Sequence, residues 1–249
     1  MNRQQRPKVT GLPALVFWTA VWYLAALGFH NPLLLPTPLQ VLGCLGRMMA
    51  AASFWKITAI SICRILLGVT AAVVLGTVLA VLTEKSRWMN LLIAPAMTAM
   101  QATPVASFTI LVLIWLNRDY VPVLICGMMG LPLVWNSVSG GIRTADGQLL
   151  EMAKVYRLSA FQTVRRIYVP SVLPFFRMAC VSALGLGWKA GIAAEVLTVP
   201  RSSIGRMISE SKLYLMTEEL FAWTLAVIVL SLLLQRAMLR LLQGREGHA

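Results

Sequence analysis

The stretch ISICRILLGVTAAVVLGTVLAVL, residues 60–82, decides the fold class of this chain. Its 23 residues carry a single charge, that of Arg64. A helix needs roughly 20 consecutive, mainly apolar residues to cross the hydrocarbon core of a bilayer. A helix that is apolar all round must be buried in protein or in lipid. The stretch therefore predicts a membrane-spanning helix.

Similar apolar stretches on both sides of residues 60–82 extend this prediction to the whole chain. They cover residues 11–29, 91–116, 120–141, 175–199 and 220–242. We therefore expect residues 1–249 to form one all-α, polytopic membrane domain with about six transmembrane helices. Between the first two spans, Pro32, Pro36 and Pro38 precede a mixed stretch at residues 39–54. This segment predicts a turn and a short helix at the membrane interface.

The composition agrees with a lipid environment and argues against several function classes. Hydrophobic residues make up 58% of the 249 residues and charged residues 12%, whereas soluble domains are about 25% charged. The net charge of +13 comes from short basic clusters between apolar runs, which the positive-inside rule explains better than nucleic-acid binding. The four cysteines lack metal-ligand or disulfide spacing and are expected to be small buried hydrophobes. The two histidines are isolated, so no metal site is expected.

The basic residues also predict the orientation in the membrane. With six spans and both termini on one side, fourteen Lys and Arg residues fall on the side of the termini and six on the opposite side. Basic residues accumulate in cytoplasmic loops. Both termini and the connection between the fourth and fifth spans are therefore predicted to be cytoplasmic.

That connection, residues 143–174, is the longest polar stretch on the predicted cytoplasmic side. Apolar residues alternate in it with charges at spacings near those of an amphipathic helix, so it is expected to fold and to dock on another surface. Pro170 and Pro174 are expected to turn the chain back into the fifth span, because proline removes a backbone hydrogen bond. Its central part, Glu151 to Pro174, reads EMAKVYRLSAFQTVRRIYVPSVLP.

This central part resembles the cytoplasmic signature of the inner-membrane subunits of binding-protein-dependent ABC importers. That signature runs Glu-Ala-Ala, three residues, Gly-Ala-Ser, then a Phe, a Val and Leu-Pro, with another Pro four residues later. Among the departures from it, Met152 replaces the first Ala and Arg157 replaces the Gly. Because a side chain is strained at positive φ, we expect the turn at Arg157 to be reshaped. The residues that keep their places are Glu151, Ala153, Ser159, Phe161, Pro170 and Pro174.

Four further segments are similar to the nitrate, sulfonate and taurine class of these permeases. They are LPTPLQVL after the first span, SICRILLGVTAAVVLG in the second, the stretch from Pro95 to Pro104 before LVLIW, and LGLGWKAGIAAEVL in the fifth. The resemblance implies a multi-pass protein of a bacterial inner membrane that carries a small anion or a related organic solute.

The resemblance further implies that a coupling helix in this connection sits in a groove of a separate ATPase subunit. The chain has no GxxxxGK[ST] phosphate loop, so we expect no enzymatic activity and no cofactor in it, with ATP and Mg²⁺ bound by that partner. Other implied partners are a periplasmic or lipid-anchored substrate-binding protein, a second permease copy in a homodimer, and membrane lipid. A helix lying on the lipid surface is the alternative. The residues expected to contact the ATPase are Glu151, Met152, Ala153, Val155, Arg157, Leu158 and Ser159.

Three ionisable residues are the best placed within predicted spans and are candidates for the translocation path. A charge at the bilayer centre costs roughly 2.5–3.5 kcal/mol on insertion scales, so each needs a partner or a watery cavity. Lys189 lies near the middle of the fifth span. Arg64 and Glu195 lie at similar depth and are expected to pair, either as a structural salt bridge or beside the path. Trp188 is a further candidate, with ordinary helix packing as its alternative.

Competing functions are separated by what the sequence contains. A secondary transporter or channel that needs no ATPase is the main alternative, but the two halves show no convincing repeat of the kind such proteins often have. An intramembrane enzyme would need a catalytic group, and the spans contain no paired carboxylates, no HExxH motif and no serine with a plausible histidine partner.

In the fifth span, Ala183, Gly187 and Gly191 recur every four residues and predict a close approach between helices.

Overall fold

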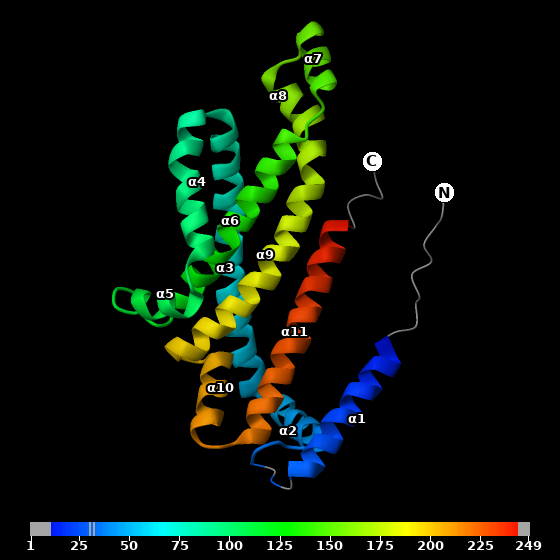
Figure 1. The fold of residues 1–249 in the computed structure, drawn as a ribbon, viewed down its shortest axis with the longest axis vertical. Helices are drawn as coiled ribbons and strands as arrows, with labels where there is room; N and C mark the ends of the chain where they lie inside the picture. The colour runs from blue at the N-terminus through cyan, green and yellow to red at the C-terminus, as the bar shows by residue number, and fades with distance from the viewer. Residues whose placement is uncertain (1–10, 30, 32, 244–249) are drawn as a thin grey trace. The chain divides into compact units, whose positions relative to one another are not determined.

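The computed structural model describes residues 11–29, 31 and 33–243, and this part of the chain is almost entirely helical (Figure 1). In chain order the elements are α1 Gly11–Phe29, α2 Pro38–Ala50, α3 Ala52–Lys85, α4 Arg87–Ala102, α5 Val105–Val112, α6 Val121–Arg143, α7 Gly147–Val155, α8 Ala160–Thr163, the π-helical η1 Val164–Tyr168, α9 Val169–Thr198, α10 Ile204–Leu213 and α11 Thr217–Gln243.

Four of the described helices are long and apolar enough to cross a membrane. They include α3, α6 and α11, and the fourth is the continuous helical stretch Ala160–Thr198. The pair α4 and α5 would add a fifth span if it crosses as one bent unit. Within α1, Pro13–Phe29 is a shorter apolar helix. An all-α membrane domain is thus confirmed, and the count of six spans stays a prediction.

The third predicted span, residues 91–116, is wrong as a single helix. The chain breaks at Thr103 and Pro104, where α4 and α5 meet at an angle of 104°. Thr103 has extended dihedral angles, φ −74° and ψ 124°. A proline disfavours helical dihedrals in the residue before it, which explains the break at this position. Beyond α5, residues 113–120 form turns instead of continuing a span.

The start of the fifth span also differs from the prediction. Residues 175–199 were expected to form it after a turn at Pro170 and Pro174, but the chain is helical without interruption from Ala160 to Thr198. Pro170 is the second residue of α9 and interrupts neither η1 nor α9. The π-helical segment η1 precedes it and changes the hydrogen-bond register. The prolines therefore do not turn the chain, and Pro174 is accommodated inside α9.

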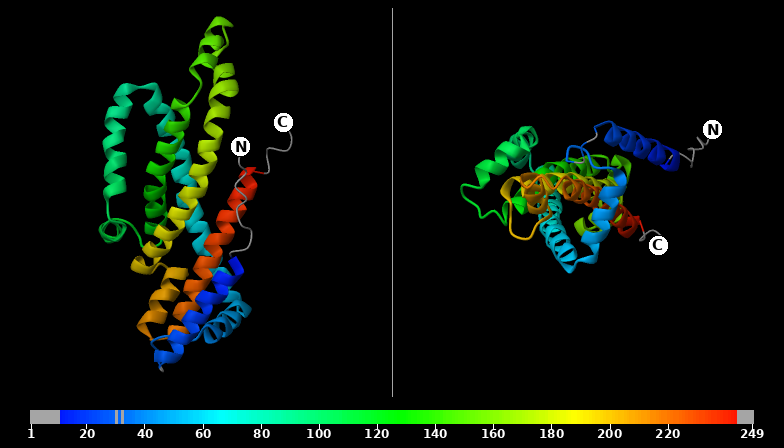
Figure 2. Two further views of the ribbon diagram at one scale, coloured as in Figure 1. Left: turned by 45° about the vertical axis from the view of Figure 1, so that its right-hand side comes forward. Right: turned by 90° about the horizontal axis from the view of Figure 1, so that it is seen from below.

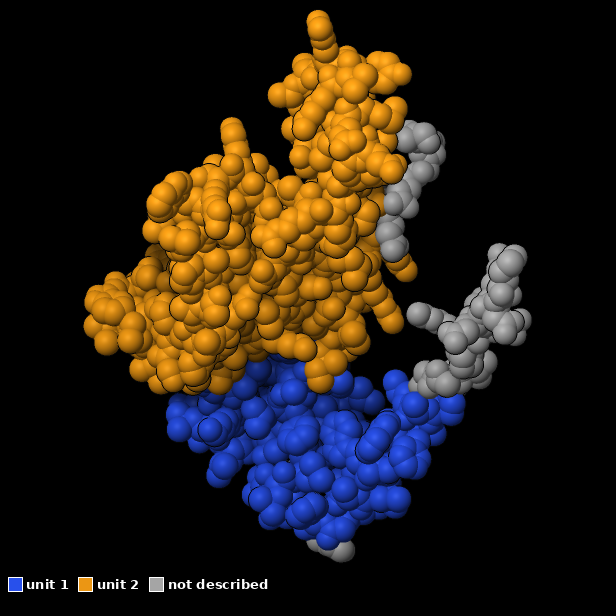
Figure 3. Space-filling view, turned by 45° about the horizontal axis from the view of Figure 1, so that its top comes forward, with its two compact units in different colours: residues 1–55, 207–227 blue, residues 56–206, 228–249 orange. Residues whose placement is uncertain are grey.

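The chain divides into two units, coloured separately in Figure 3. Unit 1 comprises residues 1–55 and 207–227, and unit 2 comprises residues 56–206 and 228–249. In unit 1, the predicted interfacial helix is present as α2, which Thr37 and Gln40 begin with a reciprocal capping box. Its apolar face packs Val41 and Cys44 against Ala222.

In unit 2, α6 and α9 form the central helix pair, and the views in Figures 1 and 2 show them side by side. The predicted small-residue stripe of α9 lies at helix contacts. A Cβ atom added to Gly187 would lie 2.6 Å from Cγ2 of Val69, and one added to Gly191 would lie 2.5 Å from Sγ of Cys126. The Cys126 thiol also donates to the Gly187 carbonyl at 3.2 Å. Small residues are therefore needed where α3, α6 and α9 meet.

The cysteines follow the prediction with one exception. Cys44, Cys126 and Cys180 are buried, as expected for small hydrophobic side chains. Cys63 is exposed and contradicts the prediction. It lies in α3 one residue before Arg64, where the buried face of the helix is occupied by its neighbours Ser61 and Ile65.

Candidate functional site

The first candidate site is a pair of short helices between α6 and α9, at one end of unit 2 in Figure 1. Asp146 begins α7: its carboxylate accepts a hydrogen bond from the Gln148 N–H at 2.8 Å. Ser159 begins α8 through a capping box with Gln162. Such caps satisfy N–H groups that a helix start leaves without partners. These local interactions hold a rigid helix–turn–helix element, as expected for a folded connection.

The turn between these helices is built around Arg157, whose φ of 50° lies in the left-handed region. The Leu158 N–H donates to the Ala153 carbonyl at 2.9 Å, and the Arg157 N–H donates to the Lys154 carbonyl at 3.1 Å. These two bonds form a Schellman motif, which usually has glycine at the left-handed position. Arg157 thus adopts the conformation that a glycine favours. The expectation that the turn is reshaped was wrong.

The side chains of this element divide into an inner anchor and an exposed apolar surface. Ala153 is buried and Leu158 is half-buried, so these two residues hold the element together. Met152 and Val155 are 52% and 79% exposed. Glu151, Arg157 and Ser159 are also exposed and place charged and polar groups beside them. The predicted contact residues therefore split into outward-facing and supporting ones.

Two exposed aromatic residues extend this surface. Tyr156 and Phe161 are 72% and 71% exposed. Neither was among the predicted contact residues, although both lie within the motif that identified the connection. An exposed aromatic residue in a polar loop is the available signal, since aromatic side chains are enriched in protein interfaces. We define the coupling surface as the exposed side chains of Glu151, Met152, Val155, Tyr156, Arg157, Ser159 and Phe161.

The second candidate site is a polar cluster in unit 2 around Glu195, which is fully buried on α9. Its carboxylate accepts hydrogen bonds from Ser61 Oγ at 2.9 Å, from Arg64 Nη1 at 3.2 Å and from the Gly205 N–H at 3.2 Å. The predicted pairing of Arg64 with Glu195 is confirmed. Gly205 lies in the first turn of α10, where a carboxylate is favoured by the unsatisfied N–H groups and the helix dipole.

The guanidinium of Arg64 extends this cluster to two loops. Nη2 donates to the Arg201 carbonyl at 2.9 Å and lies 3.5 Å from Oδ1 of Asp119. Asp119 in turn accepts a hydrogen bond from the Arg201 N–H at 2.9 Å. The Ile204 N–H donates to Ser61 Oγ at 2.9 Å. A buried charge is tolerated when its hydrogen-bonding capacity is satisfied, and these contacts meet that condition for both ions.

The same cluster surrounds a strained turn. Val199, directly after α9, has a φ of 47°, a conformation that is a genuine outlier for a β-branched residue. Its N–H donates to the Glu195 carbonyl at 2.9 Å. Strained dihedrals persist where the surrounding structure over-determines them, and here the bonds of Glu195, Arg64 and Asp119 do so.

The other two residues predicted for the path, Lys189 and Trp188, lie elsewhere on α9. Lys189 is exposed, and among the described residues it takes part in no ion pair. It shares an exposed helix face with Ser182 and Leu186. Trp188 is 2% exposed and packs inside the chain. The structure therefore brings Arg64 and Glu195 together and separates them from Lys189.

Sequence reasoning missed Ser61, Asp119, Arg201 and Gly205 as members of the polar cluster. Ser61 and Arg201 have side chains that are common on protein surfaces, and Gly205 has none. Nothing in the sequence therefore distinguishes these three residues from others of their type. Asp119 had a weak signal, because only nine acidic residues occur in the chain and this one lies next to a predicted span.

Comparisons with known proteins point to one family. A family model described as "Binding-protein-dependent transport system inner membrane component" matches residues 72–245. A protein named SsuC in Escherichia coli K12, described as an aliphatic sulfonates transport permease, is 30% identical, with 86% of this chain and 81% of the relative covered. SsuC of Bacillus subtilis 168 is 26% identical over 95% of this chain and 88% of the relative. The taurine transport system permease protein TauC of Escherichia coli K12 is 26% identical over 98% and 90%.

Proposed function

This chain belongs to the family of inner-membrane components of binding-protein-dependent transport systems, and from that premise we propose how it assembles, couples to ATP hydrolysis and selects its solute. It is the permease subunit of an ABC importer of the nitrate, sulfonate and taurine class. Membership in this family gives it an ATPase and a substrate-binding protein as partners and removes the reason to prefer an ATP-independent transporter.

The coupling surface is the contact with the ATPase subunit. The observation that carries this proposal is the exposure of Met152, Val155 and Phe161 on a rigidly capped helix pair. When a partner covers such exposed apolar side chains, the complex is stabilised by about 25 cal/mol for each Å² of apolar area removed from water. Glu151 and Arg157 add charges of both signs, which can select and orient the partner. No cofactor is needed in this chain, because ATP and Mg²⁺ bind to the ATPase.

The orientation places both termini and the coupling surface in the cytoplasm. The support is the asymmetry of basic residues, fourteen against six. The polar cluster around Glu195 then lies on the opposite, outer side, because α9 runs from the coupling surface to that cluster (Figure 1). The substrate-binding protein delivers solute on this outer side.

A second copy of the chain completes the translocation path. Lys189 supports this proposal, because it places a cation on an exposed face of a membrane-spanning helix. Facing lipid, that charge is costly, whereas a water-filled path between two copies hydrates it. Arg64 and Glu195 stabilise the outer end of the path, and Trp188 packs behind its wall.

The solute is a small anion of the sulfonate type. The names of relatives support this choice, since they include permeases for aliphatic sulfonates, taurine and bicarbonate. The positive charge of Lys189 is complementary to such a solute. Riboflavin, named for another relative, is uncharged and serves as the contrasting solute.

Co-purification and uptake test this function directly. The tagged chain should retain an ATPase subunit and a second permease copy, and vesicles containing the complex should accumulate an anion from its binding protein in an ATP-dependent manner. Glu151→Lys should insert normally but lose the ATPase, or keep it with hydrolysis uncoupled from uptake. Wild-type association and uptake in Glu151→Lys would show that α7 is not the coupling element and would favour a helix lying on the lipid surface.

A further inference from the structure

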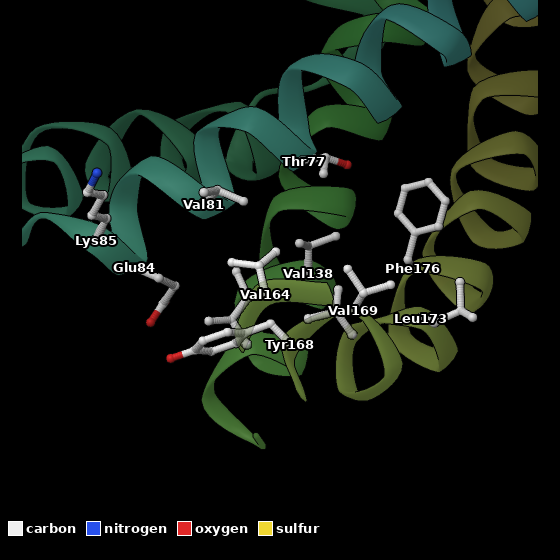
Figure 4. A pocket seen from close by; sticks show the side chains of 12 residues that line it. Thr77, Val81, Glu84, Lys85, Val138, Val164, Tyr168, Val169, Leu173 and Phe176 are labelled. Atoms are coloured by element: carbon white, nitrogen blue, oxygen red, sulfur yellow. The ribbon is translucent and has the colours of Figure 1, made fainter. Parts of the chain in front are cut away.

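A cavity of about 520 Å³ lies in unit 2 between the C-terminal parts of α3 and α6 and the junction of η1 with α9. Its wall is mainly apolar and includes Val138, Leu173 and Phe176. Four lining residues carry polar groups: Thr77, Glu84, Lys85 and Tyr168. The Thr77 hydroxyl donates to the Val73 carbonyl of its own helix at 2.7 Å. In Figure 4 the carboxylate of Glu84 and the phenolic oxygen of Tyr168 lie together at one end, and Phe176 lies at the other. The cavity is therefore amphipathic along its length.

The polar end coincides with the end of the membrane-spanning helices. Helix α3 ends at Lys85 and α6 ends at Arg143. Basic residues at the end of a span mark the level of the lipid headgroups. The apolar end thus lies at the depth of the acyl chains and the polar end at the membrane surface, on the side proposed to be cytoplasmic.

The charge at this end is positive once its ion pair is taken into account. Glu84 accepts hydrogen bonds from Arg143, with Oε1 2.8 Å from Nε and 2.7 Å from Nη2, so the two charges neutralise each other. Lys85 is exposed and takes part in no ion pair within the described part of the chain. Lys85 therefore contributes one cation to the lining of this end, which it shares with Tyr168, and each of the two side chains can bind an anionic oxygen. In Figure 4 the Lys85 ammonium points away from the Tyr168 hydroxyl.

The wall of this cavity also contains the π-helical segment of the described chain. Val164 and Tyr168 of η1 both line it. π-Helical turns are rare and occur frequently at functional sites. The segment is therefore an independent feature of the same cavity, and it connects the cavity wall to the coupling surface through α8.

We propose that this cavity binds an anionic phospholipid of the cytoplasmic leaflet, with an acyl chain along Val138, Leu173 and Phe176 and the anionic headgroup at the polar end that Tyr168 and Lys85 line. Water is a poor occupant of the apolar end, because an apolar cavity stays dry without polar partners. Basic pockets between transmembrane helices on the cytoplasmic side are known to suit anionic headgroups. This inference rests on the proposed orientation, which places the cavity in that leaflet.

Native mass spectrometry of the assembled transporter tests the site. The delipidated complex is titrated with phosphatidylglycerol or with phosphatidylcholine of identical acyl chains. Wild type should prefer phosphatidylglycerol by roughly five-fold, the size expected for one lysine near a bilayer surface. Lys85→Gln should remove this preference, and the matched control Lys56→Gln at the other end of α3 should keep it.

A second pair of variants separates the cavity from nonspecific lipid contact. Leu173→Trp fills the cavity and should lower binding of both lipids, whereas Leu186→Trp on the same helix should not. These residues make a matched pair, since they are 37% and 40% exposed. Equal lipid binding by the two tryptophan variants, or an unchanged preference in Lys85→Gln, would overturn the proposal. So would a disulfide between two copies at Leu173→Cys, which would show protein in the cavity.

Uptake and ATPase association, measured on the same preparations, report on the proposed function independently. A wild-type complex that binds lipid as expected but lacks ATP-dependent uptake would refute the function and leave the lipid site in place. Normal uptake without a lipid preference would refute the lipid site alone.

Discussion

Arg64 on α3 and Glu195 on α9 are 131 residues apart in the sequence, and their side chains meet at 3.2 Å. Glu195 is fully buried and the Arg64 side chain is 13% exposed. Since both ions also bind neutral partners, the pair closes a network that joins α3, α9, α10 and two loops. The segments around Glu195 depend on this pair for their arrangement.

Removing one member of this pair should be more harmful than removing both. Arg64→Met leaves the Glu195 carboxylate buried without its cation, which typically costs about 3–5 kcal/mol of folding stability. Adding Glu195→Gln removes the uncompensated charge and should restore part of the loss. Thermal unfolding of the purified single and double variants measures this difference. Strictly additive losses would show that the two side chains do not stabilise each other.

Gly205→Ala should destabilise the turn that follows α9. An added Cβ would lie 2.3 Å from Glu195 Cβ and 2.4 Å from the Glu195 backbone, and neither can move freely. Gly43→Ala is the control, because nothing lies within 4 Å of its added Cβ and alanine is favoured over glycine inside a helix by about 1 kcal/mol. Unfolding temperatures should fall for the first variant and hold or rise for the second.

Arg157→Gly should be tolerated, and Arg157→Val should not. A residue with a side chain costs roughly 1–2 kcal/mol in the left-handed conformation, and glycine removes this cost. Glycine also loses more conformational entropy on folding, which offsets part of the stabilisation. Valine is β-branched and suits this φ poorly. ATPase association and coupled uptake should therefore survive in the glycine variant and decline in the valine variant. Equal activity in both would show that the turn is not held at positive φ in the complex.

Lys189→Met should leave the complex assembled but reduce anion uptake. The charge is exposed on α9 and supports no described ion pair, so its loss should not lower stability. Leu186→Met on the same face is the control for altered packing. Uptake of a sulfonate is measured together with ATPase retention. Unchanged uptake in Lys189→Met would show that Lys189 lies at the lipid interface and does not line the translocation path.

Thiol labelling of single-cysteine variants should establish the orientation. In a background without native cysteines, an impermeant reagent added outside intact cells should label Arg201→Cys and spare Arg165→Cys. The native cysteines are replaced first because one of them, Cys63, is exposed. The reverse labelling pattern would invert the proposed topology.

The sequence by itself determined the helical membrane fold and most of the coupling element. Long apolar stretches such as residues 60–82 have one stable arrangement in lipid, because a helix satisfies its own backbone hydrogen bonds. Caps at Thr37, Asp146 and Ser159 are likewise local, since each joins residues two or three positions apart. Features that depend on neighbouring residues are therefore readable from the chain.

Only the tertiary structure decided the left-handed Arg157, the uninterrupted helix through Pro170 and Pro174, and the partners of Glu195. Each involves a difference of a few kcal/mol between alternative backbone conformations, as for a proline within a helix or an arginine at positive φ. Packing against distant segments tips that balance. Asp119 and Gly205 have no sequence pattern linking them to Glu195, because their contacts exist only after α3, α6 and α9 have come together.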